Sequence, residues 1–138
     1  MIEISHKTAA TVTLDTTSRL AFNDLPALVS WLLKQADVTV HNLDIGLMGD
    51  SIEYMTDHGS LTLTMRDCPA GGSQIEILCN TLVRGSREVG RQLAYQVVRR
   101  LIARADVASV MWHPTRQRIF PESFTWGRLA DAPQRLAS

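Results

Sequence analysis

Two stretches of the chain carry apolar residues at helical spacing, and they predict two amphipathic helices. The first begins after Asn23 or Asp24, either of which can cap it, and ends near Gln35–Asp37. The second begins after Ser86 and runs to about Ala105. Each helix therefore has one apolar face to bury. The apolar residues are Leu25, Leu28, Val29, Leu32 and Leu33 in the first helix, and Val89, Leu93, Val97, Leu101 and Ile102 in the second.

Apolar and polar residues alternate in much of the remaining chain, and this period of two predicts β-strands. Gly59 and the pair Gly71-Gly72 supply the tight turns between three of these strands, which favours an antiparallel meander. Ser18–Phe22 is expected to pair with the first strand, and Phe120–Trp126 to form a short strand and one helical turn. The predicted strands cover residues 8–14, 38–43, 52–56, 61–66, 74–80 and 107–113.

The order of these elements predicts a two-layer α+β sandwich. Both amphipathic helices are expected to cover one face of a mostly antiparallel sheet. The strand–helix–strand unit from Gln74 to His113 is typical of a right-handed parallel crossover. Residues 1–127 are expected to form a single domain, and residues 128–138 a polar C-terminal tail that frays.

Composition narrows the class of protein. The 138 residues are 45% hydrophobic and 20% charged, as in ordinary globular domains. The N-terminus lacks the basic start and apolar run of a signal peptide, and no apolar stretch is long enough to span a membrane. We therefore expect a cytoplasmic protein with no membrane partner. Cys68 and Cys79 fall at opposite ends of a predicted hairpin, too far apart for a disulfide, and Cys79 alternates with Ile75 and Ile77 like a small core residue.

The charge is zero in total but uneven along the chain. The whole sequence has 14 Lys+Arg and 14 Asp+Glu. Residues 1–69 hold four of the basic and nine of the acidic residues, a net charge of −5, whereas residues 70–138 hold ten and five, a net charge of +5. A net charge of zero and scattered aromatic residues argue against a nucleic-acid partner. The two halves favour instead a homodimer in which acidic and basic regions meet.

Every basic residue after position 69 is an arginine, and three of them cluster where the second helix begins. Arg84, Arg87 and Arg91 would place guanidinium groups beside the unbonded N–H groups of the helix N-terminus, which favours phosphate or carboxylate. They form a candidate anion-binding site for a small anionic ligand. The alternative is that these arginines form a solvated outer face or pair with the acidic half of the chain.

The segment Arg87-Glu88-Val89-Gly90-Arg91-Gln92 resembles the phosphate-binding loop of the acyl-CoA N-acetyltransferase superfamily. That loop has the pattern Arg/Gln-x-x-Gly-x-Gly/Ala between a strand and a long helix. Arg87 and Gly90 match the pattern, and Gln92 stands where the family has Gly or Ala. The resemblance implies a loop whose backbone N–H groups bind the coenzyme A pyrophosphate. No cofactor is expected from the rest of the sequence.

The histidines suggest one further site. They include no pair at the i, i+4 spacing that places two metal ligands on one helix face, so no metal is expected. His41, Asp44 and His113 form a candidate polar cleft for acid–base or metal chemistry if strands 38–43 and 107–113 are neighbours. The alternative is that they are ordinary surface or strand-end residues.

Aromatic residues are most concentrated near the C-terminal end, at Trp112, Phe120, Phe124 and Trp126. Aromatic side chains are enriched at protein interfaces, so these four residues are a candidate interaction surface. The alternative is that this segment folds back and covers one open end of the core.

These features favour a small non-enzymatic domain that binds a partner protein or associates with itself through an exposed sheet face or edge. The alternative is an anion- or phosphate-ligand-binding protein or enzyme that uses the arginines at the start of the second helix. Neither interpretation assigns a catalytic residue.

Overall fold

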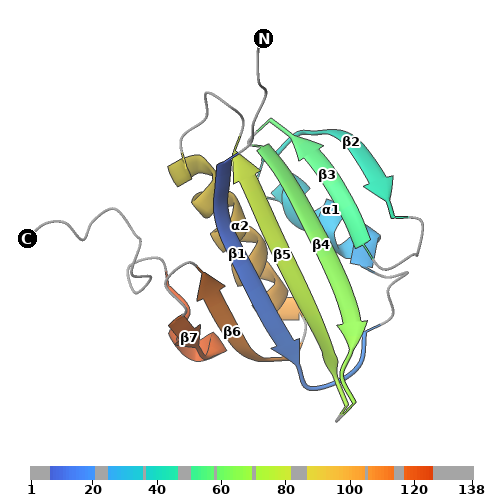
Figure 1. Cartoon of the computed structure of the whole chain (residues 1–138), viewed down its shortest axis with the longest axis vertical. Coiled ribbons are helices and arrows are strands. Elements are labelled where there is room, and N and C mark those ends of the chain that lie inside the picture. Colours follow the sequence, from blue (N-terminus) through green and yellow to red (C-terminus); the bar gives the residue numbers. More distant parts are fainter. Residues whose placement is uncertain are drawn as a thin grey trace, which may run out of the picture.

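Within the residues that the computed structural model describes, the chain forms one seven-stranded sheet, two α-helices and a 3-10 turn (Figure 1). These residues are 7–20, 25–35, 37–46, 51–57, 59–69, 71–81, 87–104, 106–113 and 117–125. The strands are β1 (Lys7–Thr16), β2 (Val40–Ile45), β3 (Ser51–Thr56), β4 (Gly59–Asp67), β5 (Ser73–Thr81), β6 (Val107–His113) and β7 (Gln117–Ile119). The helices are α1 (Leu25–Gln35) and α2 (Arg87–Arg104), and the 3-10 turn is Pro121–Ser123.

β1 lies inside the sheet, whose strand order is β2-β3-β4-β5-β1-β6-β7. All neighbouring strands pair antiparallel, and β2 to β5 follow one another as a meander, so the predicted α+β class is confirmed. β5 and β6 both run antiparallel to β1 and are therefore parallel to each other. The predicted crossover from Gln74 to His113 thus joins two parallel strands that have β1 between them.

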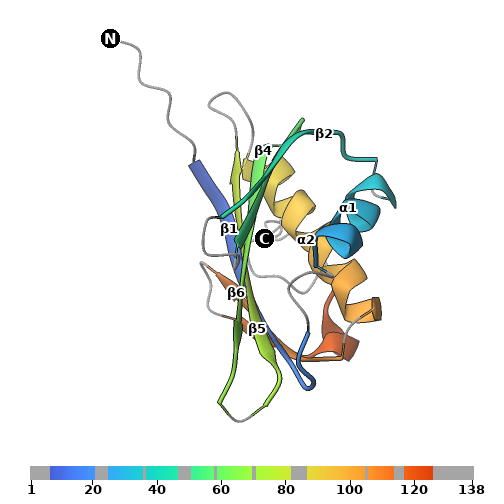
Figure 2. The same cartoon turned by 90° about the vertical axis from the view of Figure 1, so that its right-hand side faces the viewer.

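Both helices cover the same face of the sheet, as the two-layer prediction requires (Figure 2). Alternate residues of the inner strands point toward the helices and are buried, and one apolar face of α2 meets them. Burying a large aliphatic side chain contributes roughly 1.5–3 kcal/mol to folding, so this layer is the main source of stability. The buried set includes Val12, Leu14, Leu61, Leu63, Ile75 and Ile77 from the sheet, and Leu93, Val97 and Leu101 from α2.

The way α1 ends explains why β2 begins later than predicted. The Val38 N–H donates to the Leu33 carbonyl at 2.9 Å, and the Asp37 N–H donates to the Lys34 carbonyl at 3.1 Å. These are the two hydrogen bonds of a Schellman motif, and Asp37 has the left-handed conformation (φ 60°) where glycine is usual. Val38 is therefore part of the helix end, and strand pairing begins at Val40.

The segment after β1 does not form the predicted partner strand. Thr17 and Ser18 form a bend, and residues 19–20 have no strand pairing; residues 21–24 lie outside the described part of the chain. β1 has no edge left for such a partner, because β5 pairs with one side of it and β6 with the other. The prediction that Ser18–Phe22 pairs with the first strand is wrong for the residues described.

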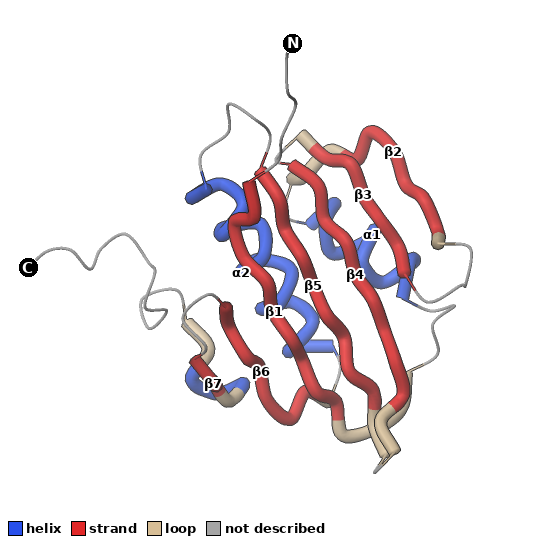
Figure 3. The backbone as a smooth tube through the Cα atoms, viewed as in Figure 1, coloured by secondary structure: helices blue, strands red, loops and turns tan. Residues whose placement is uncertain are grey.

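The C-terminal segment supplies the strand at the edge opposite β2 (Figure 3). β7 pairs with β6, with Arg118 opposite Met111, and comes slightly earlier than the short strand predicted within residues 120–126. The predicted helical turn is present at Pro121–Ser123. Residues 126–138, which include the predicted tail 128–138, lie outside the described residues.

The turn between β4 and β5 is tied to the end of β1 by hydrogen bonds. The Ser73 N–H donates to Thr16 Oγ1 at 2.9 Å, and the Thr16 hydroxyl donates in turn to the Ser18 carbonyl at 2.7 Å. The Leu20 N–H donates to the Ser73 hydroxyl at 3.0 Å. Gly72 lies against this network with a φ of 79°, and a Cβ there would collide with the carbonyl oxygen of Thr16.

We expect Gly72→Ala to destabilise the protein more than Gly71→Ala. Both glycines have a positive φ, which costs an alanine about 1–2 kcal/mol. A Cβ built on Gly71 has nothing within 4 Å, whereas the clash with Thr16 should add about 1–3 kcal/mol at position 72. Urea unfolding of the two variants measures the difference, and equal losses of unfolding free energy would contradict the turn geometry.

Candidate functional site

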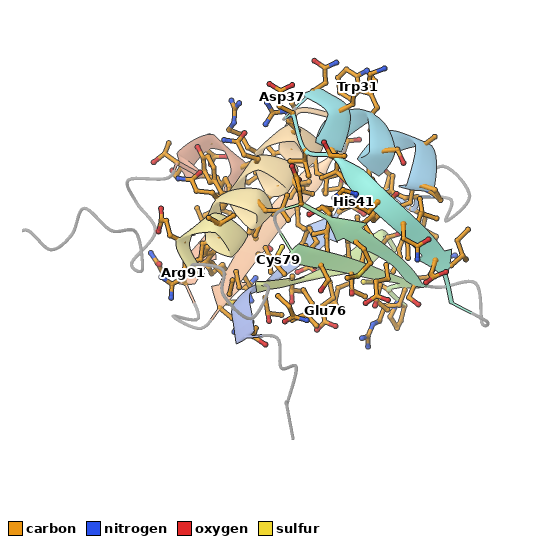
Figure 4. The ribbon with its side chains drawn as sticks, turned by 90° about the horizontal axis from the view of Figure 1, so that it is seen from above. Trp31, Asp37, His41, Glu76, Cys79 and Arg91 are labelled. Atoms are coloured by element: carbon orange, nitrogen blue, oxygen red, sulfur yellow. The ribbon has the colours of Figure 1, made fainter. Side chains whose placement is uncertain are left out.

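The candidate polar cleft is not formed. His41 lies on β2 and is exposed at the edge of the sheet (Figure 4). Asp44 is exposed on the same strand, and His113 lies at the end of β6. Strands β3, β4, β5 and β1 separate β2 from β6, so the two strands are not neighbours and the prediction of a shared cleft is wrong. The physical reason is that β1 pairs with β5 and β6, which leaves the meander to extend away from β6 to the far edge.

The cysteines behave as core and turn residues. Cys79 is completely buried in β5 opposite Leu61, and Cys68 lies beyond the other end of the same ladder; both thiols are free. Burial raises the pKa of the Cys79 thiol, so this group stays protonated and is a poor nucleophile. Among the residues described, no three His, Cys, Asp or Glu side chains are grouped closely enough to hold a metal ion.

Of the three arginines in the candidate anion-binding site, the structure describes the side chain of one. Arg91 is half-buried, and its Nε–H donates to the backbone carbonyl of Ala9 at 3.4 Å, which ties α2 to β1. Arg84 and the side chain of Arg87 lie outside the described residues. The anion site therefore stays a prediction.

The segment that resembles a phosphate-binding loop is helical where it is described. Arg87–Gln92 form the first turns of α2, and Gly90 is buried there. From the second turn of a helix onward, each backbone N–H is bonded to the carbonyl four residues earlier, so it is not available to a pyrophosphate. The preceding residues 82–86 lie outside the described part of the chain.

The aromatic segment folds back on the core beside β6. Trp112 is fully buried, and the Phe124 ring packs against it with ring centroids 6.2 Å apart. Phe124 also stacks on Tyr95 of α2 at a centroid distance of 5.2 Å. Phe120 is 53% exposed, and Trp126 lies outside the described residues. The prediction of an interaction surface is therefore wrong for Trp112 and Phe124, which are core residues.

A polar network crosses the sheet face opposite the helices. Arg118 Nη1 donates to the Ser109 hydroxyl at 3.2 Å, and that hydroxyl donates to Asp15 Oδ2 at 3.4 Å. Gln74 Nε2 donates to the other carboxylate oxygen of Asp15 at 3.2 Å. The network links β7, β6, β1 and β5. The hydrogen bonds give these side chains partners within the sheet.

β2 is the most unusual part of the surface. All six of its residues are exposed, and Val40, Leu43 and Ile45 are half of the six large apolar side chains exposed by more than a third among the residues described. Leu43 lies opposite Tyr54 and Ile45 opposite Ile52, both fully buried, so the two side chains point to the helix-covered face. We name Val40, Leu43 and Ile45 the edge strip. It was not predictable from the sequence, because alternation does not reveal which strand lies at an edge.

Tyr54 explains why the edge strip lies beyond the helix layer. Its hydroxyl donates to the Pro26 carbonyl at 3.1 Å and lies 3.4 Å from the Ser30 hydroxyl, so α1 docks on β3. Burial raises the pKa of Tyr54, and the hydrogen bond with Ser30 offsets part of this rise, so the phenol is a neutral donor at physiological pH. α1 accordingly lies behind β3 and β4 and leaves β2 uncovered (Figure 1).

Comparison of the chain with known protein families, with curated proteins and with solved structures gives no match. Neither helix in the described part of the chain is both long and apolar enough to cross a membrane.

We expect Phe124→Ala to lower the free energy of unfolding by about 3–5 kcal/mol, the usual cost of removing a buried ring. Phe120→Ala should cost less than about 0.5 kcal/mol, since that ring is mostly in water. Chemical denaturation of both variants makes the comparison. Similar losses for the two would show that the aromatic segment is not part of the core.

Proposed function

We propose that the chain is a non-enzymatic module that associates with itself through β2, forming a two-fold dimer in which two sheets join into one. The exposed edge strip carries this proposal. An edge strand presents unpaired backbone N–H and C=O groups, and exposed apolar residues on it favour pairing with another chain. β2 contains no lysine or proline, the residues that most often block an edge.

The sequence of β2 is complementary to itself in antiparallel pairing. A two-fold axis at Leu43 places this residue against its own copy, and places Asn42 against Asp44 of the second copy on both sides of the axis. Asn42 and Asp44 share one face of the strand, where Asn42 Nδ2 donates to Asp44 Oδ2 at 3.4 Å. In the dimer each carboxylate would also face an amide donor of the other copy, so the charge of Asp44 would support pairing.

The edge strip gives the dimer an apolar contact beside the helices. Leu43 is 37% exposed and Ile45 is 53% exposed, although both point to the face that elsewhere forms the core. Removing the remaining apolar area from water is favourable by about 25 cal/mol per Å². The second copy would thereby cover the apolar side chains of β2 that α1 leaves exposed.

The proposed contact differs from the one expected from charge alone. β2 belongs to the acidic half of the chain, so the dimer joins two acidic regions instead of an acidic and a basic one. Pairing in this register avoids placing the two Asp44 carboxylates directly opposite each other, because Asn42 takes that position.

We expect the wild-type protein to sediment as a dimer and Leu43→Lys to sediment as a monomer. A lysine on an edge strand opposes strand pairing, and here two ammonium groups would meet at the two-fold axis. Sedimentation velocity over a concentration series measures the association. Phe120→Ala, which removes an exposed apolar side chain at the other end of the sheet, is the matched control and should remain dimeric. A wild-type monomer at every concentration tested would overturn the proposal.

Exchanging the polar pair tests the register itself. Asn42→Asp places two carboxylates opposite each other twice in the dimer and should raise its dissociation constant about tenfold. The double variant Asn42→Asp/Asp44→Asn restores an amide opposite each carboxylate with the positions exchanged, and should recover the wild-type dissociation constant. If the double variant is as weak as Asn42→Asp, the dimer uses another register or another surface.

A further inference from the structure

A cleft of about 310 Å³ lies between the end of α1 and the middle of α2. Val38 and Leu93, both core residues, contribute its apolar wall, and Gln35, Gln92 and Gln96 line it together with two charged residues. Its volume is at the lower end of the range of small-molecule sites, roughly 300–1,000 Å³, so it suits a small ligand.

Asp37 provides the negative charge of this cleft, where the chain leaves α1 (Figure 4). It is the one non-glycine residue with a positive φ among those described, a conformation that costs about 1 kcal/mol relative to glycine. Its carboxylate makes no hydrogen bond or ion pair within the described part of the chain. Aspartate is one of the few non-glycine residues that adopt this conformation, so the helix end places a carboxylate in the lining of the cleft.

Arg100 provides the positive charge of the cleft, from the opposite wall. Its Nη1 donates to the backbone carbonyl of Gln96 at 3.4 Å and also to the side-chain Oε1 of the same residue. These bonds hold the guanidinium along α2, one turn from Gln96. Nε and Nη2 donate no hydrogen bond to any residue in the described part of the chain. A guanidinium binds a carboxylate through two parallel hydrogen bonds.

Asp37 and Arg100 line the same cleft without forming an ion pair with each other. A simple anion would be repelled by Asp37, and a simple cation by Arg100. The C-terminal end of α1 adds partial negative charge beside Asp37, which further favours an ammonium group there. We propose that the cleft binds a small zwitterion, a free amino acid, with its carboxylate on Arg100 and its ammonium on Asp37. This site does not depend on the β2 dimer.

The test begins with the full chain and the twenty L-amino acids. In a thermal-shift series, at least one amino acid should raise Tm in a concentration-dependent manner, because a ligand that binds only the folded state stabilises it. Calorimetric titration then compares that amino acid with the carboxylic acid that lacks its amino group and with the amine that lacks its carboxyl group. Both analogues should bind at least tenfold more weakly.

Variants then assign the two charges. Asp37→Asn and Arg100→Gln should each weaken binding of the same amino acid at least tenfold while the circular dichroism spectrum is unchanged. Asp37→Gly should raise Tm of the ligand-free protein, since it relieves the strained backbone, and should also lose binding. Arg99→Gln, at the exposed neighbouring position outside the cleft, is the matched control and should bind as the wild type does.

Three results would overturn the proposal. One is the absence of a Tm shift with every amino acid. Another is equal affinity for the analogue that lacks the amino group, which would make the cleft a simple anion site. The last is unchanged binding in Asp37→Asn or in Arg100→Gln.

Discussion

The pairing of β1 on both sides, with β5 and with β6, is the constraint on which the rest of the structure depends. Each of these pairings satisfies backbone groups that would be costly to bury alone. It also requires the chain to cross the sheet twice, once through α1 and once through α2, and both crossings lie on the same face. The Arg91 contact with Ala9 ties the second crossing to β1 itself. One face is thereby covered, and the other carries the polar network around Asp15.

The same arrangement makes the two edges of the sheet unequal. β7 is three residues long, and the segment after it turns inward so that Phe124 packs between Tyr95 and Trp112. That edge is short and closed by its own chain. β2 has six residues, and α1 is held one strand away from it by Tyr54. The apolar residues of β2 are therefore of the kind usually found in a core, but they are exposed at the surface.

Local features of this fold were predictable from the sequence because they depend on periodicity and on a few turn residues. The strand predicted over Val107–His113 has the same bounds in the structure, and the meander turns at its glycines. Strand order was not predictable, since no local pattern says that β1 lies between β5 and β6. The prediction of a cleft at His41, Asp44 and His113 was wrong for this reason.

The candidate sites likewise depended on the path of the chain, which the sequence does not show. Large aromatic side chains such as Trp112 and Phe124 are found both at interfaces and in cores. Only the path of the chain decides which of the two they belong to. The edge strip looks like any half-buried strand until its position is known. Asp37 did carry a sequence signal, an aspartate directly after a predicted helix where glycine is usual, but its cleft needs Arg100 from a distant helix.

The place of β1 also has a kinetic consequence. Thr11 pairs with Leu78 and with His113, so β1 forms its contacts with strands that lie far along the chain from it. Such contacts between distant parts of the chain slow folding, because the intervening chain must be ordered before they form. Until then both edges of β1 are open to other chains. Its threonines at positions 8, 11 and 13 expose less apolar surface during this time than aliphatic residues at the same positions would.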